Sequence, residues 1–176
     1  MSRPIRTLLF ATNLSEDCRP ALETARFFAE QFGVGVVLLH VIDRALPSQV
    51  DEHFKGVLGE KKWEGLKKEH EQDAREALIG KMTSGKIVEK VMENYRSETG
   101  IDTGERNLNW REVVVEEKNV GNAILDQAKE HGCDLIVLGS RKGFISGNAV
   151  GTTIRHVLGK AEMPVMVVPK RSKSAA

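Results

Sequence analysis

The chain has 176 residues, a formal net charge of +1 and a sequence pI near 7.8. This length suits a single domain with a sizeable core, and the balanced charge gives no electrostatic reason to expect nucleic acid or an acidic membrane as a partner. No apolar run approaches the roughly 20 residues that span a bilayer, and we expect no secretory signal. Cys18 and Cys133 do not make a disulfide framework, and free thiols suit a reducing cytoplasm.

The N-terminal part of the chain predicts a strand, a helix and a second strand. Residues 7–11 and 36–41 are apolar runs of strand length, and between them an apolar stripe at helical spacing ends near Phe32. We expect Ser15 or Asp17 to cap the helix, Pro20 to be tolerated in its first turn and Gly33 to end it. A strand, a helix and a strand in this order indicate a right-handed crossover in a parallel sheet.

An enlarged and highly charged helical segment is predicted at about 44–110. Residues 46–59 have no clear period. Two apolar stripes follow, on either side of Gly80 and Gly85, and predict two helices or one broken helix. The first stripe consists of Trp63, Leu66, His70, Ala74 and Ala77, and the second of Ile87, Val88, Val91, Met92 and Tyr95. After a polar loop at 100–107, residues 110–115 predict a third strand, and a short helix around 123–128 ends by Gly132.

The C-terminal part of the chain predicts strand, glycine-rich turn, helix and strand. Residues 135–138 are wholly apolar, as in a strand buried on both faces, and residues 165–168 form a second such run. Between them a glycine-rich stretch leads to a helical stripe formed by Ile154, Val157, Leu158 and Ala161. A turn of this kind brings unpaired N–H groups and a positive helix end together, which favours phosphate. We therefore predict a doubly wound α/β fold, with helices on both faces of a five-stranded parallel sheet.

The segment DLIVLGSRKG, together with GTTIRHVLGKAEMPVMVVP further on, resembles the C-terminal signature of the universal stress protein family. Residues 5–15 resemble the first strand and loop of that family, and residues 37–43 its second strand. The resemblance implies one Rossmann-like domain over 1–170, with the strand order 3-2-1-4-5, and a homodimer formed through residues 165–168. It also implies a cytoplasmic stress-response protein that binds ATP or AMP, with or without Mg²⁺, and acts as a regulator or sensor. The short basic stretch at the C-terminus predicts a disordered tail at 171–176.

The resemblance also implies which residues would bind the nucleotide. Nucleotide-binding members carry a spaced glycine motif that closes on Gly-Ser or Gly-Thr, and here the stretch from Gly139 to Gly151 is one position shorter. In similar proteins the first loop supplies Pro and Asp near adenine and ribose, where this chain has Ala11 and Asn13, and the backbone at Val41 would contact adenine. The expected binding residues are Ala11, Asn13, Val41, Gly139, Arg141, Lys142, Gly143, Gly151, Thr152 and Thr153.

Other interpretations of these residues remain open. The glycines could serve close backbone packing, and the changed loop is compatible with a nucleotide-free interaction module of the same fold. A slow phosphohydrolase or nucleotidyl-transfer enzyme is a further alternative, but no general base is evident, so we assign neither a catalytic residue nor a metal ligand. His40 in an apolar strand is more typical of a core histidine, and Glu69, His70 and Asp73 are more typical of a solvated helix face.

Overall fold

The computed structural model describes residues 4–43, 60, 61, 64, 109–140 and 151–170. Residues 1–44 and 103–176 form one compact unit, to which every element named below belongs, and residues 45–102 form a second. The two predicted apolar stripes between 63 and 95, the polar loop and the tail at 171–176 lie outside the described residues. One domain over 1–170 therefore stays a prediction.

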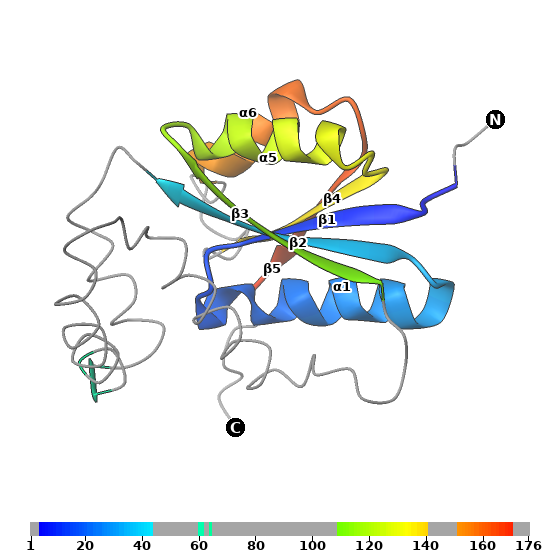
Figure 1. The fold of residues 1–176 in the computed structure, drawn as a ribbon, viewed down its shortest axis with the longest axis horizontal. Coiled ribbons are helices and arrows are strands. Elements are labelled where there is room, and N and C mark those ends of the chain that lie inside the picture. The colour runs from blue at the N-terminus through cyan, green and yellow to red at the C-terminus, as the bar shows by residue number, and fades with distance from the viewer. Residues whose placement is uncertain (1–3, 44–59, 62–63, 65–108, 141–150, 171–176) are drawn as a thin grey trace, which may run out of the picture. The chain divides into compact units, whose positions relative to one another are not determined.

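Five parallel strands form one sheet, which confirms the predicted fold class (Figure 1). The strands run in the order β3-β2-β1-β4-β5, as predicted. Their bounds are β1 Thr7–Thr12, β2 Gly35–Asp43, β3 Trp110–Glu117, β4 Leu135–Ser140 and β5 Val165–Pro169. Four parallel pairings connect them. From β1 the chain adds β2 and β3 on one side of the sheet, and it then crosses back to add β4 and β5 on the other side of β1. The strand order therefore reverses between β1 and β4.

Helices cover both faces of this sheet (Figure 1). Helix α1, Arg19–Phe32, lies on one face, and helices α5, Val120–Glu130, and α6, Thr152–Lys160, lie on the other. Gly33 ends α1 as predicted, in the left-handed conformation at φ 63° with its N–H bonded to Ala29 O at 3.0 Å. The prediction that Ser15 or Asp17 caps α1 was wrong. A short 3₁₀ turn, η1 Glu16–Cys18, precedes the helix, so that Cys18 occupies the N-cap without a side-chain cap bond.

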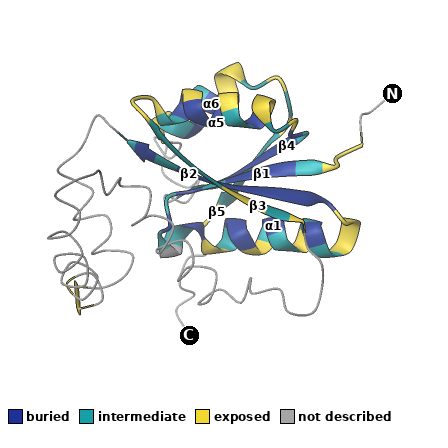
Figure 2. Cartoon of the chain, viewed as in Figure 1, coloured by how far each residue is buried: buried dark blue, intermediate teal, exposed yellow. Residues whose placement is uncertain are grey.

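The core lies between the central strands and these helices (Figure 2). Phe10 and Leu38 are fully buried, and burial of a side chain of this size contributes about 1.5–3 kcal/mol. On the α5–α6 side, a cluster joins residues of β1, β2 and β4 to the inner faces of both helices: Leu9, Val37, Leu39, Ile124, Leu125, Ala128, Cys133, Ile136, Leu138, Ile154 and Val157. Leu158 was expected in the buried stripe of α6, but it is 49% exposed because only Ile154 and Val157 face the core.

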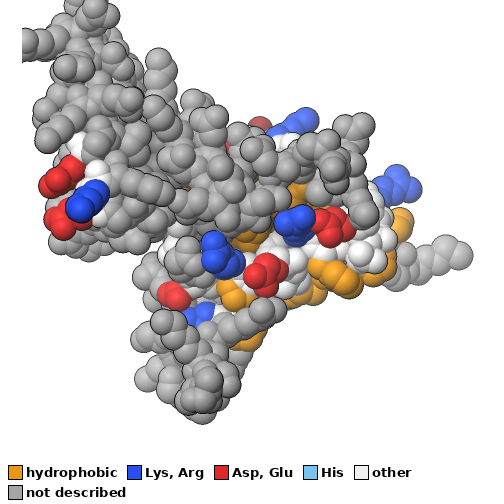
Figure 3. All heavy atoms as spheres, turned by 90° about the horizontal axis from the view of Figure 1, so that it is seen from below, with side chains coloured by type: hydrophobic (Ala, Val, Ile, Leu, Met, Phe, Trp, Pro, Cys, Tyr) orange, Lys and Arg blue, Asp and Glu red, His pale blue; other side chains and the backbone are white. Residues whose placement is uncertain are grey.

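The outer side of α1 carries exposed hydrophobic side chains among charged ones (Figure 3). Phe27 and Phe32 are 54% and 66% exposed and stack edge to face at a centroid distance of 6.2 Å. Phe28 packs against both rings. In the described part of the chain, no helix is long and apolar enough to cross a membrane.

Candidate functional site

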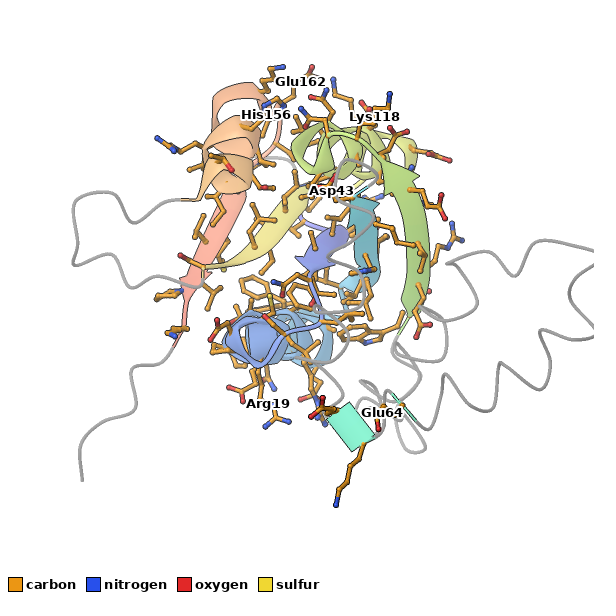
Figure 4. All side chains as sticks on the ribbon, turned by 90° about the vertical axis from the view of Figure 1, so that its left-hand side faces the viewer. Arg19, Asp43, Glu64, Lys118, His156 and Glu162 are labelled. Atoms are coloured by element: carbon orange, nitrogen blue, oxygen red, sulfur yellow. The ribbon has the colours of Figure 1, made fainter. Side chains whose placement is uncertain are left out.

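Several predicted binding residues lie at one edge of the sheet, where the parallel strands end (Figure 4 faces this edge). Asn13 follows β1, Val41 lies near the end of β2, and Gly139 lies near the end of β4. In open α/β sheets, ligands bind beyond the carboxyl ends of the strands, where the strand order reverses. The reversal beside β1 puts Asn13 and Gly139 on neighbouring strands at that point.

The loop after β1 is held by bonds within itself. Leu14 is buried and has a positive φ of 61°, which an L-residue rarely adopts. Its N–H donates to Thr12 Oγ1 at 2.9 Å. A strained residue of this kind persists only where its surroundings fix it, and such residues cluster at functional sites. The loop is therefore preorganised at the sheet edge where a ligand would bind.

Asn13 ties the loop before η1 together through its side-chain oxygen. Asn13 Oδ1 accepts hydrogen bonds from Ser15 N at 3.1 Å, Ser15 Oγ at 2.6 Å and Cys18 Sγ at 3.0 Å. The sequence analysis did not predict that Ser15 and Cys18 would contact Asn13. The signal that points to it is an Asn two residues before a Ser, since an Asn side chain commonly bonds the backbone two residues on.

Gly139 packs closely against the start of α1. A Cβ atom on Gly139 would lie 3.2 Å from Cys18 Sγ, 3.3 Å from Cys18 Cα and 3.5 Å from Ala21 Cβ. These distances match the packing interpretation that the sequence left open, because β4 and α1 approach each other at a position that a side chain would crowd. A role of Gly139 in phosphate binding stays a prediction.

The N-terminus of α6 lacks a side-chain cap. Gly151 is its N-cap, no side chain of the described residues bonds the first turn, and that turn contains no acidic residue. A Cβ atom on Gly151 would meet no atom within 4 Å. By contrast, α5 is capped by Asn119, whose Oδ1 accepts from Asn122 N at 2.9 Å. Gly151, Thr152 and Thr153 therefore leave backbone donors and two hydroxyl groups available at the positive end of α6.

Ala11 and Val41 direct their side chains into the core, where they pack against the α5–α6 cluster. Both side chains are partly buried, and the group at Val41 that could form a hydrogen bond with a ligand is its backbone. Gly35 N bonds Arg6 O on the β1 side, and Val36 N bonds Asn109 O on the β3 side. Because alternate residues of β2 direct their peptide groups to the same neighbour, those of Val41 face β1, as those of Gly35 do. The β1 pairing ends at Thr12 and His40, and the next β1 donor, Leu14 N, bonds Thr12 Oγ1 instead. In the described chain, β1 therefore supplies no ladder donor to the Val41 carbonyl.

His40 is a buried core histidine, as the sequence analysis favoured. It is 4% exposed, and its Nδ1–H donates to Thr12 O at 3.0 Å, which ties the ends of β1 and β2 together. Across residues 4–43, 109–140 and 151–170, no three His, Cys, Asp or Glu side chains gather as a metal site. Arg141, Lys142 and Gly143 lie outside the described residues, as do Glu69, His70 and Asp73.

The fold and its strand order define a doubly wound α/β protein. A model described as the universal stress protein family matches residues 4–169. The chain is 30% identical over 176 residues to universal stress protein MJ0577 of Methanocaldococcus jannaschii, an alignment that covers 98% of this chain and 99% of that protein. The chain belongs to the universal stress protein family.

Solved structures share this fold. The structure of MJ0577 has a TM-score of 0.58 at 24% identity and covers 96% of this chain and 99% of that chain. A universal stress protein in complex with cAMP has a TM-score of 0.58 at 12% identity, covering 96% and 100%. The universal stress protein from Archaeoglobus fulgidus in complex with dAMP has a TM-score of 0.50 at 18% identity, covering 93% and 97%. At these identities the likeness establishes the fold, and the nucleotides belong to those proteins.

Proposed function

We propose that this protein binds an adenine nucleotide, ATP or AMP, at the carboxyl edge of its sheet and acts as a regulator or sensor in the cytoplasm. The observation that carries the proposal is the uncapped N-terminus of α6, which begins at Gly151 and has no acidic residue in its first turn. Such a helix end binds phosphate through its free N–H groups and its dipole. Thr152 and Thr153 add hydroxyl donors at the same place.

The rest of the nucleotide would lie along the ends of β1 and β2. In the arrangement that the family resemblance implies, adenine meets the Val41 backbone beside Ala11, and the ribose lies beside Asn13. The Val41 carbonyl suits this role, because an acceptor without a ladder donor complements the exocyclic amino group of adenine. The cAMP and dAMP complexes of proteins with the same fold give further support. We also propose that the phosphate groups lie near Gly139, Arg141, Lys142 and Gly143. ATP would bind with or without Mg²⁺.

A nucleotide-free interaction module is the second candidate, and one observation favours it. The side-chain oxygen of Asn13 is engaged by Ser15 and Cys18 within its own loop. That oxygen is therefore not available to a ribose hydroxyl group or a metal ion. We also propose a homodimer through Val165, Met166, Val167 and Val168, because β5 is the last strand in the sheet order and its residues are only half-buried.

The proposed function is tested by placing a carboxylate at the N-cap of α6. Gly151→Asp should weaken ATP and AMP binding at least tenfold in titration calorimetry, because its carboxylate occupies the position of the phosphate. The fold should be unharmed, since Asp is a preferred N-cap residue and no atom lies within 4 Å of a Cβ there. Gly159→Asp is the matched control, because a Cβ atom on Gly159, in the last turn of the same helix, also meets no atom within 4 Å.

The expected result is reduced affinity in Gly151→Asp and wild-type affinity in Gly159→Asp. Native mass spectrometry of the purified wild type should also show a co-purified adenine nucleotide. Equal affinity in all three proteins would remove α6 from the site. Absence of binding to the wild type would leave the interaction module as the better hypothesis, and turnover of ATP would point instead to the enzyme alternative.

A further inference from the structure

The orientation of the Asn13 amide is fixed by the groups that surround its oxygen. The Ser15 backbone N–H can only donate, so the Asn13 atom 3.1 Å from it must be the oxygen and not the nitrogen. The Ser15 hydroxyl at 2.6 Å and the Cys18 thiol at 3.0 Å donate to the same oxygen. Three donors occupy the acceptor capacity of Oδ1, and the amide nitrogen is therefore directed away from the η1 turn.

The Asn13 nitrogen is a free donor at the edge of the sheet. Asn13 is half-buried, and its Nδ2 makes no hydrogen bond within the described part of the chain. In that same part, Trp110 Nε1 is the single buried side-chain polar atom that lacks a partner, so the described residues do not bury Nδ2. Two N–H groups are thus presented beside the last residue of β1, where the strand order reverses.

This arrangement sets the polarity of the ligand atom that fits there. An aspartate in the same conformation would keep one oxygen for the three donors and present the other, which would accept from ribose hydroxyl groups. Asn13 presents donors instead. The complementary atom is therefore an acceptor, and a charged phosphoryl oxygen suits it better than a hydroxyl group, because a hydrogen bond to a charged acceptor is roughly twice as strong.

We propose that Asn13 is a specificity-determining residue that selects adenine nucleotides with a phosphoryl oxygen on the ribose 3′ position. Adenosine 3′,5′-bisphosphate and 3′,5′-cyclic AMP carry this group, whereas AMP carries free 2′ and 3′ hydroxyl groups. The inference rests on the proposed function, which places the ribose beside Asn13. Because Oδ1 is occupied, binding of these ligands does not require a divalent cation at this position.

The test compares three ligands on three proteins by titration calorimetry in the absence of Mg²⁺. The ligands are AMP, adenosine 3′,5′-bisphosphate and 3′,5′-cyclic AMP. Asn13→Asp replaces the Nδ2 donor by a carboxylate oxygen of similar size and position. The other carboxylate oxygen still accepts from Ser15 and Cys18, as Oδ1 does in the wild type. Asn119→Asp is the matched control, because it makes the same exchange at the cap of α5, two strands away along the same sheet edge. Thermal unfolding of each variant checks that the fold is retained.

The wild type and Asn119→Asp should bind a 3′-phosphorylated ligand roughly tenfold more tightly than AMP, the effect of one charge-assisted hydrogen bond. Asn13→Asp should abolish or reverse that preference. Whichever of the two 3′-phosphorylated ligands binds more tightly identifies the form of the group that the site takes. A preference for AMP in the wild type, or an unchanged preference in Asn13→Asp, would overturn this inference and leave the proposed function standing. No binding of any adenine nucleotide to the wild type would overturn both.

Discussion

Gly121 in the first turn of α5 lies directly against the imidazole ring of His156 on α6. A Cβ atom on Gly121 would lie 2.6 Å from His156 Cδ2 and 3.2 Å from its Cβ. His156 Nε2 lies 2.6 Å from Asn122 Oδ1, so the residue after Gly121 in α5 contacts the same ring. Helix α6, which begins at the proposed phosphate-binding turn, therefore packs closely on α5 because Gly121 has no side chain.

We expect Gly121→Ala to destabilise the fold even though alanine is the better helix former. Overpacking against the ring should lower the free energy of unfolding by about 1–3 kcal/mol. In a His156→Ala background the same substitution should stabilise by up to about 1 kcal/mol, because the contact is gone and only helix propensity remains. Urea denaturation of the four proteins in a double-mutant cycle measures the difference. An equal effect of Gly121→Ala in both backgrounds would contradict the contact.

Gly139→Ala should also destabilise the protein, by about 1–3 kcal/mol, because the new Cβ atom would meet the backbone and thiol of Cys18. Gly159→Ala is the comparison, since a Cβ atom there has open space, and it should be neutral or stabilising by up to about 1 kcal/mol. The same denaturation measurement separates the two. If Gly139→Ala is as stable as the wild type, the packing role is wrong and phosphate binding becomes the better explanation of Gly139.

Most of the fold could be predicted because its signals are local. The strands in the middle of the sheet are buried on both faces, so β1 and β4 appear in the sequence as short apolar runs. Gly33 ends α1 through a conformation that glycine adopts readily. The strand order followed from the family resemblance together with the alternation of strands and helices, and the structure confirms it.

The details of the candidate site could not be predicted, because they depend on contacts between distant residues. Gly139 meets Cys18 only after β4 and α1 have packed together, so a motif alone cannot show that its glycine fills a packing role. Asn13 was assigned through the family resemblance, whereas its contact with the Cys18 thiol depends on where η1 places Cys18. Leu158 fits the apolar spacing of α6, yet the helix turns it outward.

Cys133 predicts a pH dependence of stability in the alkaline range. Burial raises the pKa of the Cys133 thiol from its ordinary 9.0 to about 11, and the neighbouring Asp134 carboxylate adds to the shift. The unfolded chain releases this proton first as pH rises, so the folded state binds more protons between pH 9 and 11. The contribution of Cys133 to the free energy of unfolding is therefore complete below pH 9 and falls above it, by at most about 1.4 kcal/mol per pH unit.

Denaturation of the wild type and of Cys133→Ala at a series of pH values from 7 to 11 isolates this contribution. The variant loses the thiol and its packing, which gives a constant offset at neutral pH. The difference in unfolding free energy between the two proteins should then shrink as pH rises through 9 to 11. Two parallel curves over that range would show that the Cys133 thiol does not titrate differently in the folded state.

The outer edge of β5 can be tested separately from its packing. Ile136 N bonds Pro164 O, and Lys170 N bonds Ser140 O, both at 3.0 Å. Because alternate residues of a parallel strand face the same neighbour, the Met166 and Val168 peptide groups face β4, and those of Val165 and Val167 face away from it. Val167 also packs its side chain against the core cluster, so a lysine there would test packing as well as assembly.

We therefore expect Val167→Pro to convert the proposed homodimer to a monomer. Proline removes only the N–H that faces away from the sheet, so the bonds to β4 remain and the fold should survive. Met166→Pro is the matched control, because it removes a donor to β4 and should lower the free energy of unfolding instead. Multi-angle light scattering at micromolar concentration, with thermal unfolding of each variant, distinguishes the two effects. A folded Val167→Pro that dimerises as tightly as the wild type would exclude backbone pairing through β5 as the basis of assembly.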